Sequence, residues 1–213
     1  MNELITGLFQ ESISGIALGC IYALIALGFT LIYKASEVVN FAQGEVMMVG
    51  AYVNFFFVSY FSSMVGEVNG WVFLLAFLGS IIFAVIFGIT LDFIINRPLK
   101  DEPVFSIIMA TISLGIILRA LTALIAGPIS LVPQSPFGGS VMEVGGVVVS
   151  YLDLSIIFSA VVLMGLFFVF FNKTRWGIAM KATSEDSEAA QLMGIPVKKV
   201  YMIVWVFASI VGV

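Results

Sequence analysis

The chain contains no histidine and one cysteine, Cys20, among its 213 residues. It can therefore form no internal disulfide, has no Cys/His set for a transition metal, and lacks an imidazole for proton transfer at neutral pH. The phosphate-binding pattern G-x-x-x-x-G-K-[ST] is also missing, which excludes ATP hydrolysis by that route. We predict no catalytic residue, no metal site and no cofactor in this chain.

Charge is scarce as well. Only 10% of the residues are charged, 61% are hydrophobic, and the mean hydropathy is +1.16. A soluble domain carries roughly 25% charged residues, so this composition predicts a protein that spans a membrane several times and contacts lipid. The net charge of −4 says little about partners, because in a membrane protein the placement of Lys and Arg matters and their sum does not. We expect no nucleic acid as a partner.

Apolar runs of about 20 residues are needed to cross a bilayer, and the sequence contains five. They predict one transmembrane domain over 1–213, an all-α polytopic helix bundle. A sixth run begins near Val200 and reaches Val213, too short a distance to span. We therefore expect the chain to be a C-terminally truncated part of a longer protein. The five runs are 12–33, 39–61, 70–95, 103–126 and 151–171.

The basic residues predict how the chain is oriented. Eight of the nine fall in loops on one side of the membrane, whereas the loops on the other side, 1–11, 62–69 and 127–150, contain only acidic charges. Because Lys and Arg are concentrated in cytoplasmic loops, we expect the N-terminus outside and the loop 172–199 in the cytoplasm of a cell inner membrane protein. The eight residues are Lys34, Arg97, Lys100, Lys173, Arg175, Lys181, Lys198 and Lys199.

Two further features concern the outer half of the chain. Arg119 lies inside the fourth run near its outer end, where it can snorkel to the interface or pair within the bundle; we favour snorkelling. The segment 126–150 is rich in proline and glycine, which predicts turns and a small hairpin. As the largest outer element, it is the natural surface for an extracytoplasmic partner.

The segment "VVNFAQGEVMMVGAYVNFFF", 38–57, places Asn40, Gln43 and Glu45 in an apolar run beside Gly44. One interpretation is that Asn40 caps a helix and Glu45 lies favourably in its first turns. The other is a broken or partly re-entrant segment that lines a translocation path, where Gly44 leaves room and the two amides offer hydrogen bonds. At 100° per residue Glu45 points away from the face of Asn40, Gln43 and Gly44.

The stretch "TRWGIAMKATSEDSEAAQLMGIPVKK", 174–199, is the one long polar segment. Thr183 and Ser184 are good N-cap residues and Asp186 stands in a capping-box position, which predicts a helix that begins near Ser184. Gly194 and Pro196 predict its end. At about 1.5 Å per residue the helix is too short to cross a bilayer, so it needs a surface to lie on. Its apolar residues are Ala189, Leu192, Met193 and Ile195.

The pattern E-A-A-x-x-x-G formed by Glu188, Ala189, Ala190 and Gly194 resembles the cytoplasmic coupling loop of ABC importer permeases. The segments "GIALGCIYALIALGFTLIY", "VNFAQGEVMMVGAYV" and "RWGIAMKATSEDSEAAQLMGI", together with Arg97-Pro98, resemble the branched-chain amino acid permeases of the hydrophobic amino acid uptake family. These segments span nearly the whole chain. Members of that family continue past position 213.

The resemblance implies a type II-like ABC importer permease that moves branched-chain or related amino acids. It implies a second permease subunit, two ATPase subunits that bind ATP and magnesium, and an extracytoplasmic solute-binding protein. The implied substrate path includes Asn40, Gln43, Gly44 and Glu45. The residues implied in ATPase coupling are Glu188, Ala189, Ala190, Leu192, Met193 and Gly194.

Two alternatives remain open from the residues alone. A secondary transporter driven by an ion gradient needs an intramembrane ionisable residue; the acidic candidates are Glu45 and Asp92, and we expect both near the cytoplasmic interface, which disfavours coupling at the midplane. A purely structural membrane protein is disfavoured by the polar residues of 38–57.

Overall fold

The structure is a computed structural model that describes residues 2–36, 39–66, 69–99, 102–127, 140–144 and 147–213. It is helical apart from one hairpin. The elements are α1 (Asn2–Ser36), α2 (Gln43–Val65), α3 (Gly70–Leu91), the π-helix η1 (Asp92–Asn96), α4 (Arg97–Leu99), α5 (Val104–Ala126), β1 (Val141–Val144), β2 (Val147–Ser150), α6 (Tyr151–Lys173), α7 (Arg175–Glu185), α8 (Ser187–Leu192) and α9 (Val197–Ile210).

Five helical segments are long and apolar enough to span a membrane, and they confirm the five predicted runs. Three differ from the prediction in their bounds, and the second of these, which begins at Gln43 instead of residue 39, is described below. The first helix begins at Asn2 rather than near residue 12, because the polar residues before the apolar run continue the helix. The third run continues through η1 and α4. The spans are Thr6–Lys34, Gln43–Val65, Gly70–Leu99, Val104–Ala126 and Tyr151–Lys173.

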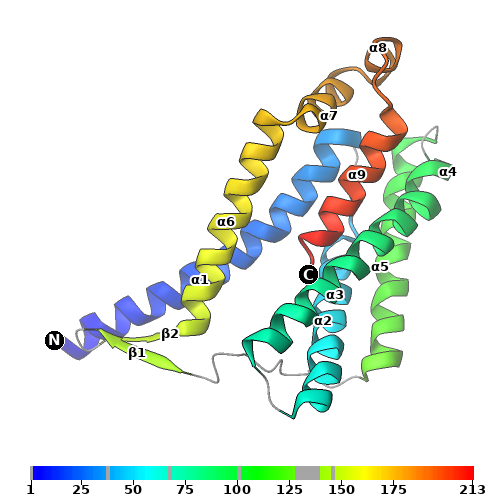
Figure 1. The fold of residues 1–213 in the computed structure, drawn as a ribbon. Helices are drawn as coiled ribbons and strands as arrows, with labels where there is room; N and C mark the ends of the chain where they lie inside the picture. Colours follow the sequence, from blue (N-terminus) through cyan, green and yellow to red (C-terminus); the bar gives the residue numbers. More distant parts are fainter. Residues whose placement is uncertain (1, 37–38, 67–68, 100–101, 128–139, 145–146) are drawn as a thin grey trace.

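The helices form two groups (Figure 1). In one, α1 and α6 lie side by side, with the hairpin at their far end. In the other, α2 packs on α3 and α5, and α9 packs on α3. The two groups are joined because α9 also packs along α1. The hairpin is antiparallel, with Val141 opposite Ser150, which confirms the predicted hairpin; residues 128–139 of the same loop lie outside the described residues.

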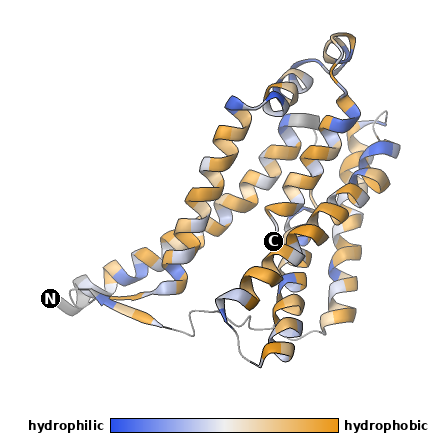
Figure 2. Cartoon of the chain, viewed as in Figure 1, coloured by the Kyte–Doolittle hydropathy of each residue, from blue (hydrophilic) through white to orange (hydrophobic). Residues whose placement is uncertain are grey.

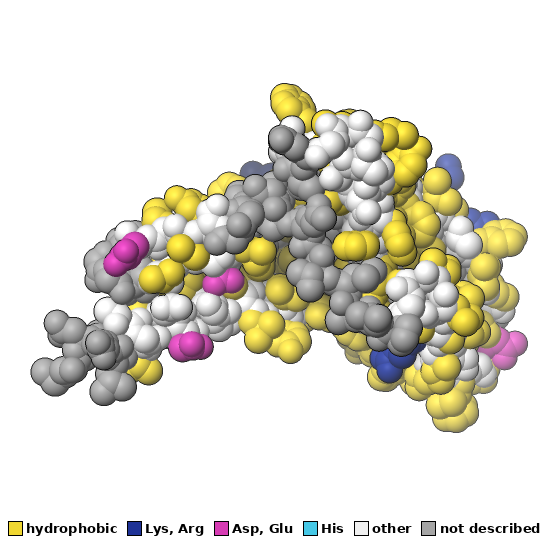
Figure 3. Space-filling view, turned by 90° about the horizontal axis from the view of Figure 1, so that it is seen from below, with side chains coloured by type: hydrophobic (Ala, Val, Ile, Leu, Met, Phe, Trp, Pro, Cys, Tyr) yellow, Lys and Arg dark blue, Asp and Glu magenta, His cyan; other side chains and the backbone are white. Residues whose placement is uncertain are grey.

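The short helices α4, α7 and α8 gather at one end of the molecule (Figure 1). The described basic residues other than Arg119 belong to this end, since they lie in the last turns of α1 and α6, in α4, in α7 and in the first turn of α9. Figure 2 shows hydrophilic residues in the same place. The opposite end, seen in Figure 3, is mainly apolar, with acidic side chains on the arm formed by α1, α6 and the hairpin. Lys100 and Glu67 lie outside the described residues.

The second span begins inside the bundle. A Cβ built on Gly28 of α1 would lie 3.0 Å from Cδ of Gln43, and a Cβ on Gly115 would lie 3.7 Å from Cα of Ala42. Gly115 is the middle residue of α5. After α1 ends, the chain therefore returns into the bundle through the non-helical residues Val39 and Asn40 and a turn before α2 begins. The helix of the second span therefore begins at Gln43, four residues after the start of the apolar run predicted from residue 39.

The helices α3 and α9 approach each other at Gly88. A Cβ at this position would lie 2.7 Å from Cα of Val206 and 2.9 Å from the carbonyl oxygen of Trp205. The two backbones therefore touch with no side chain between them. Trp205 and the neighbouring apolar residues of α9 belong to the main buried cluster.

Candidate functional site in the bundle and at the coupling end

Gln43 is fully buried, and its Nε2 donates a hydrogen bond to the carbonyl oxygen of Ala208 in α9 at 3.0 Å. The absence of a side chain at Gly28 provides the space for its amide. Its Oε1 is buried with no hydrogen-bond partner among the described residues. The side chain thus joins the first turn of α2 to α9 and keeps one acceptor available.

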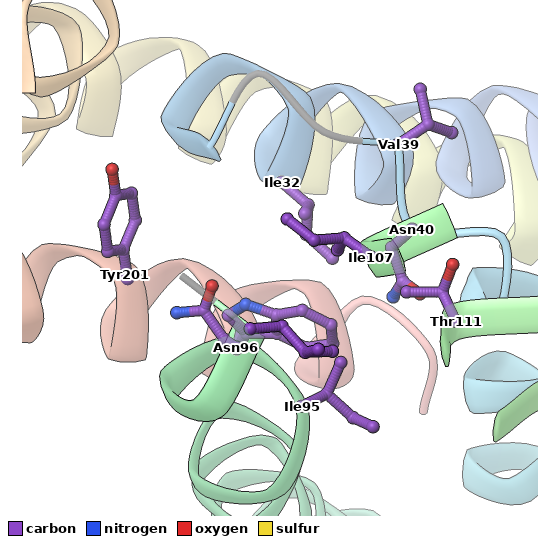
Figure 4. A pocket seen from close by; sticks show the side chains of 10 residues that line it. Ile32, Val39, Asn40, Ile95, Asn96, Ile107, Thr111 and Tyr201 are labelled. Carbon is purple, nitrogen blue, oxygen red and sulfur yellow. The ribbon is translucent and has the colours of Figure 1, made fainter. Parts of the chain in front are cut away.

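Asn40 precedes α2 and does not act as its N-cap, which is Ala42. Its Oδ1 instead accepts the N–H of Ala42 at 3.0 Å, while its Nδ2 is buried and unpaired among the described residues. Asn40 lines a cavity of about 50 Å³ together with Asn96, Thr111 and Trp205. Figure 4 shows Asn40 and Thr111 next to each other in this cavity. The volume is enough to admit water. The cavity is lined mainly by apolar side chains with a few polar groups, and five segments of the chain meet there.

The structure separates the remaining residues of the predicted path. Gly44 is exposed, and a Cβ there would meet no atom within 4 Å. Glu45 faces α5, where its Oε1 accepts a hydrogen bond of 2.6 Å from Nη2 of Arg119. The prediction that Gln43 and Gly44 lie on the same face of the helix is therefore wrong. The side chain of Gln43 contacts α9, whereas Gly44 faces outward.

The ion pair corrects two further expectations. Arg119 pairs with Glu45 instead of snorkelling, because side chains on a helix tilt toward its N-terminus, and for α5 that direction leads to Gly115 and Glu45. Glu45 lies beside the midpoint of α5, whereas the sequence predicted a position near the end of its span. Sequence periodicity within 38–57 could not reveal this depth, which depends on the return of the chain after α1.

Asp92, by contrast, lies close to the basic end, as predicted. It is 1% exposed and opens the π-helix η1. Its Oδ1 accepts a hydrogen bond from Asn96 at 2.8 Å and its Oδ2 accepts one from Nε of Arg97 at 3.0 Å. A buried carboxylate paired in this way stabilises the wide turn of the π-helix and directs Arg97 over the ring of Phe93.

The polar segment after α6 forms two helices, not one. Thr174 caps α7 by accepting the N–H of Gly177 at 3.1 Å, and Met180 and Thr183 are buried against the bundle. The predicted helix start near Ser184 is wrong, because these residues continue α7. The second helix, α8, is capped by Asp186, whose Oδ1 accepts the N–H groups of Glu188 and Ala189 at 2.9 Å each.

The end of α8 agrees with the prediction. Gly194 has a φ of +85°, its N–H donates to the carbonyl of Gln191, and the N–H of Ile195 donates to the carbonyl of Ala190, both at 3.0 Å. These two bonds define a Schellman motif. The chain then turns at Pro196 directly into α9.

Most of the predicted coupling residues are exposed. Leu192 is 88% exposed and Met193 is 84% exposed, whereas Ala190 is 5% exposed. Glu188, Ala189 and Gly194 are also on the surface. Ala190 faces the chain's own bundle and is therefore not part of the free surface. We call the exposed residues Ala189, Leu192 and Met193 the tip of α8.

A bundle of helices long and apolar enough to span a membrane, with buried amides in its interior, is the architecture of a polytopic membrane protein. Residues 12–212 match the family described as "Branched-chain amino acid transport system / permease component", and the chain belongs to that family. The family consists of transport components rather than enzymes.

Curated relatives agree along nearly the whole chain. The chain is 29% identical over 214 residues to the high-affinity branched-chain amino acid transport system permease protein LivH of Escherichia coli, covering 98% of this chain and 69% of LivH. It is 30% identical over 206 residues to the corresponding protein BraD of Pseudomonas aeruginosa, covering 94% of this chain and 66% of BraD. A probable LivH permease of Methanocaldococcus jannaschii is 27% identical over 195 residues, covering 87% of this chain and 58% of the relative. No solved structure matches the chain.

Proposed function

We propose that this chain is a permease subunit of an ABC importer that moves branched-chain or related amino acids. The observation that carries the proposal is the exposed apolar tip of α8, capped at both ends and joined directly to α9. Exposed leucine and methionine side chains next to each other favour a protein contact. The relatives' names, which give branched-chain amino acid transport, support the substrate class.

The substrate path in this proposal includes Asn40, Gln43, Gly44 and Glu45. Buried amides with unpaired atoms and an intramembrane ion pair are costly in a bilayer unless they serve a function. They lie where α2 begins within the bundle, and irregular backbone at membrane depth is tolerated where it is covered by protein or lines a cavity.

The proposed assembly has two permease subunits, two ATPase subunits and an extracytoplasmic solute-binding protein. The ATPase subunits bind ATP and magnesium, and they contact the permease at the tip of α8. Cofactors belong to the ATPase subunits. The chain lies in the cell inner membrane with its N-terminus outside and loop 172–199 in the cytoplasm. Seven described basic residues at the α7 and α8 end support this orientation.

Uptake by the purified transporter tests this function. We expect proteoliposomes that contain the full complex to accumulate leucine only when ATP and the solute-binding protein are supplied. Uptake that needs a proton or sodium gradient and no ATP would favour the secondary transporter. For that alternative, the position of Glu45 beside the middle of α5 is a supporting observation, since coupling residues lie near the midplane.

Cysteine labelling tests the orientation. In a Cys20→Ser background, which removes the one native cysteine, we expect Glu185→Cys at the exposed end of α7 to react with a membrane-impermeant maleimide only after the membrane is opened. The matched position Gln10→Cys, exposed near the start of α1, should react in intact cells. The reverse pattern would contradict the proposed orientation.

A further inference from the structure

The ion pair between Glu45 and Arg119 has an unusual exposure. The side chain of Arg119 is 74% exposed and that of Glu45 is 18% exposed, although both residues lie in membrane-spanning helices. A guanidinium in contact with hydrocarbon is expensive, and charged groups within spans face protein or a water-filled cavity. The surface around Arg119 therefore borders a protein partner or a water-filled path rather than lipid.

The pair also leaves hydrogen-bonding capacity unused. Within the described residues Arg119 makes one hydrogen bond, to Glu45, out of its five N–H donors. Oε2 of Glu45 accepts none in the same part of the chain and lies 3.3 Å from the position of a Cβ on Gly115. An ion pair that served only to hold α2 against α5 would be stronger if both carboxylate oxygens of Glu45 accepted hydrogen bonds from the guanidinium of Arg119.

Apolar residues continue the same face of α5. Ile112 and Ile116 precede Arg119 by seven and three residues, so they share its side of the helix. Ile112 is 39% exposed and Ile116 is 66% exposed. One surface thus presents a cation and an anion next to each other. The branched apolar side chains of Ile112 and Ile116 lie beside them, toward the N-terminus of α5.

We propose that Glu45 and Arg119 bind the two charged ends of a zwitterionic amino acid during translocation. The guanidinium of Arg119 donates hydrogen bonds to the substrate carboxylate through its free N–H groups. The carboxylate of Glu45 accepts hydrogen bonds from the substrate ammonium group, and the substrate side chain lies along Ile112 and Ile116. In the absence of substrate the two residues neutralise each other. This inference rests on the proposed function, because it needs an amino acid as the substrate.

Charge exchange separates this role from a purely structural ion pair. In proteoliposomes with the full transporter, we expect Glu45→Gln and Arg119→Gln each to lower ATP-driven leucine uptake at least about tenfold, since each removes a charge-assisted bond to the substrate. The double variant Glu45→Arg with Arg119→Glu retains an ion pair. It should restore the yield and melting temperature of the complex without restoring uptake, because the substrate would bind in the reversed orientation.

The matched control is Asp153→Asn, which neutralises a carboxylate of α6 that bonds Ser14 at 2.8 Å and lies on the other helix group. We expect normal uptake from this variant. Restored uptake in the exchanged double variant, or full uptake in Glu45→Gln, would contradict this inference. The proposed function would still stand in that case, because the wild-type complex transports leucine. A wild-type complex that transports no amino acid contradicts both.

Discussion

Replacing Leu192 by aspartate is expected to abolish ATP-driven uptake while the membrane-spanning helices still fold. Leu192 is 88% exposed at the end of α8, so the bundle loses no packing. In the proposed complex, however, the new carboxylate would be desolvated at the ATPase contact without a partner. A central contact residue is worth about 2 kcal/mol or more, so ATPase binding should weaken by at least about 30-fold.

The control for this prediction is Glu185→Gln, which changes an exposed charge at the end of α7. A solvated charge at a helix end contributes only about 0.3–1 kcal/mol, so ATPase binding and uptake should be nearly normal. Co-purification with the ATPase, measured with uptake on the same preparations, tests both variants. If Leu192→Asp bound the ATPase normally and Glu185→Gln lost this binding, the ATPase would dock through charges and not through an apolar contact.

Gln43→Leu is expected to reduce uptake by about tenfold without preventing assembly of the complex. The change removes the hydrogen bond from α2 to the carbonyl of Ala208 and leaves that buried acceptor unpaired, at a cost of about 1–3 kcal/mol. The shape of the side chain is nearly retained, so packing next to Gly28 persists. We expect the loss to appear in transport, because Gln43 lies where the proposed path meets the helix that continues from α8.

Thr122→Val is the matched control, because among the described residues the hydroxyl of Thr122 bonds only the carbonyl of Leu118, within its own helix α5. It should transport normally. Uptake by proteoliposomes and size-exclusion chromatography of the complex measure the two effects. Unchanged uptake in Gln43→Leu would assign this residue to packing alone.

The membrane spans could be predicted because their signal is local. Each run of apolar residues of sufficient length became a helix, and the Gly194 terminator took its left-handed conformation as expected. The start of α8 could not be predicted in the same way. Thr183 and Asp186 are both acceptable caps by residue type, and burial of Thr183 against the bundle, which is a tertiary effect, decided in favour of Asp186.

The positions of the polar residues in 38–57 depended on long-range contacts. A helical projection assumes a continuous helix, whereas Asn40 lies in non-helical chain and α2 begins at Gln43. The partner of Glu45 is 74 positions away in the sequence, and no spacing rule connects them. The signal that could have suggested the pair was the presence of one acidic and one basic residue in two different spans, since unpaired charges there are costly.

The contact at Gly88 limits how the molecule can deform. Where two backbones touch, no rotamers can exchange to let one helix slide past the other, so shear between α3 and α9 is resisted. A force applied at α8 should therefore rotate these two helices as a single stiff block. Bending is left to non-helical connections such as Ile195 to Pro196, which directly precede α9. Trp205 of this block and Asn40 line the same cavity, so a rotation of the block changes the shape of that cavity.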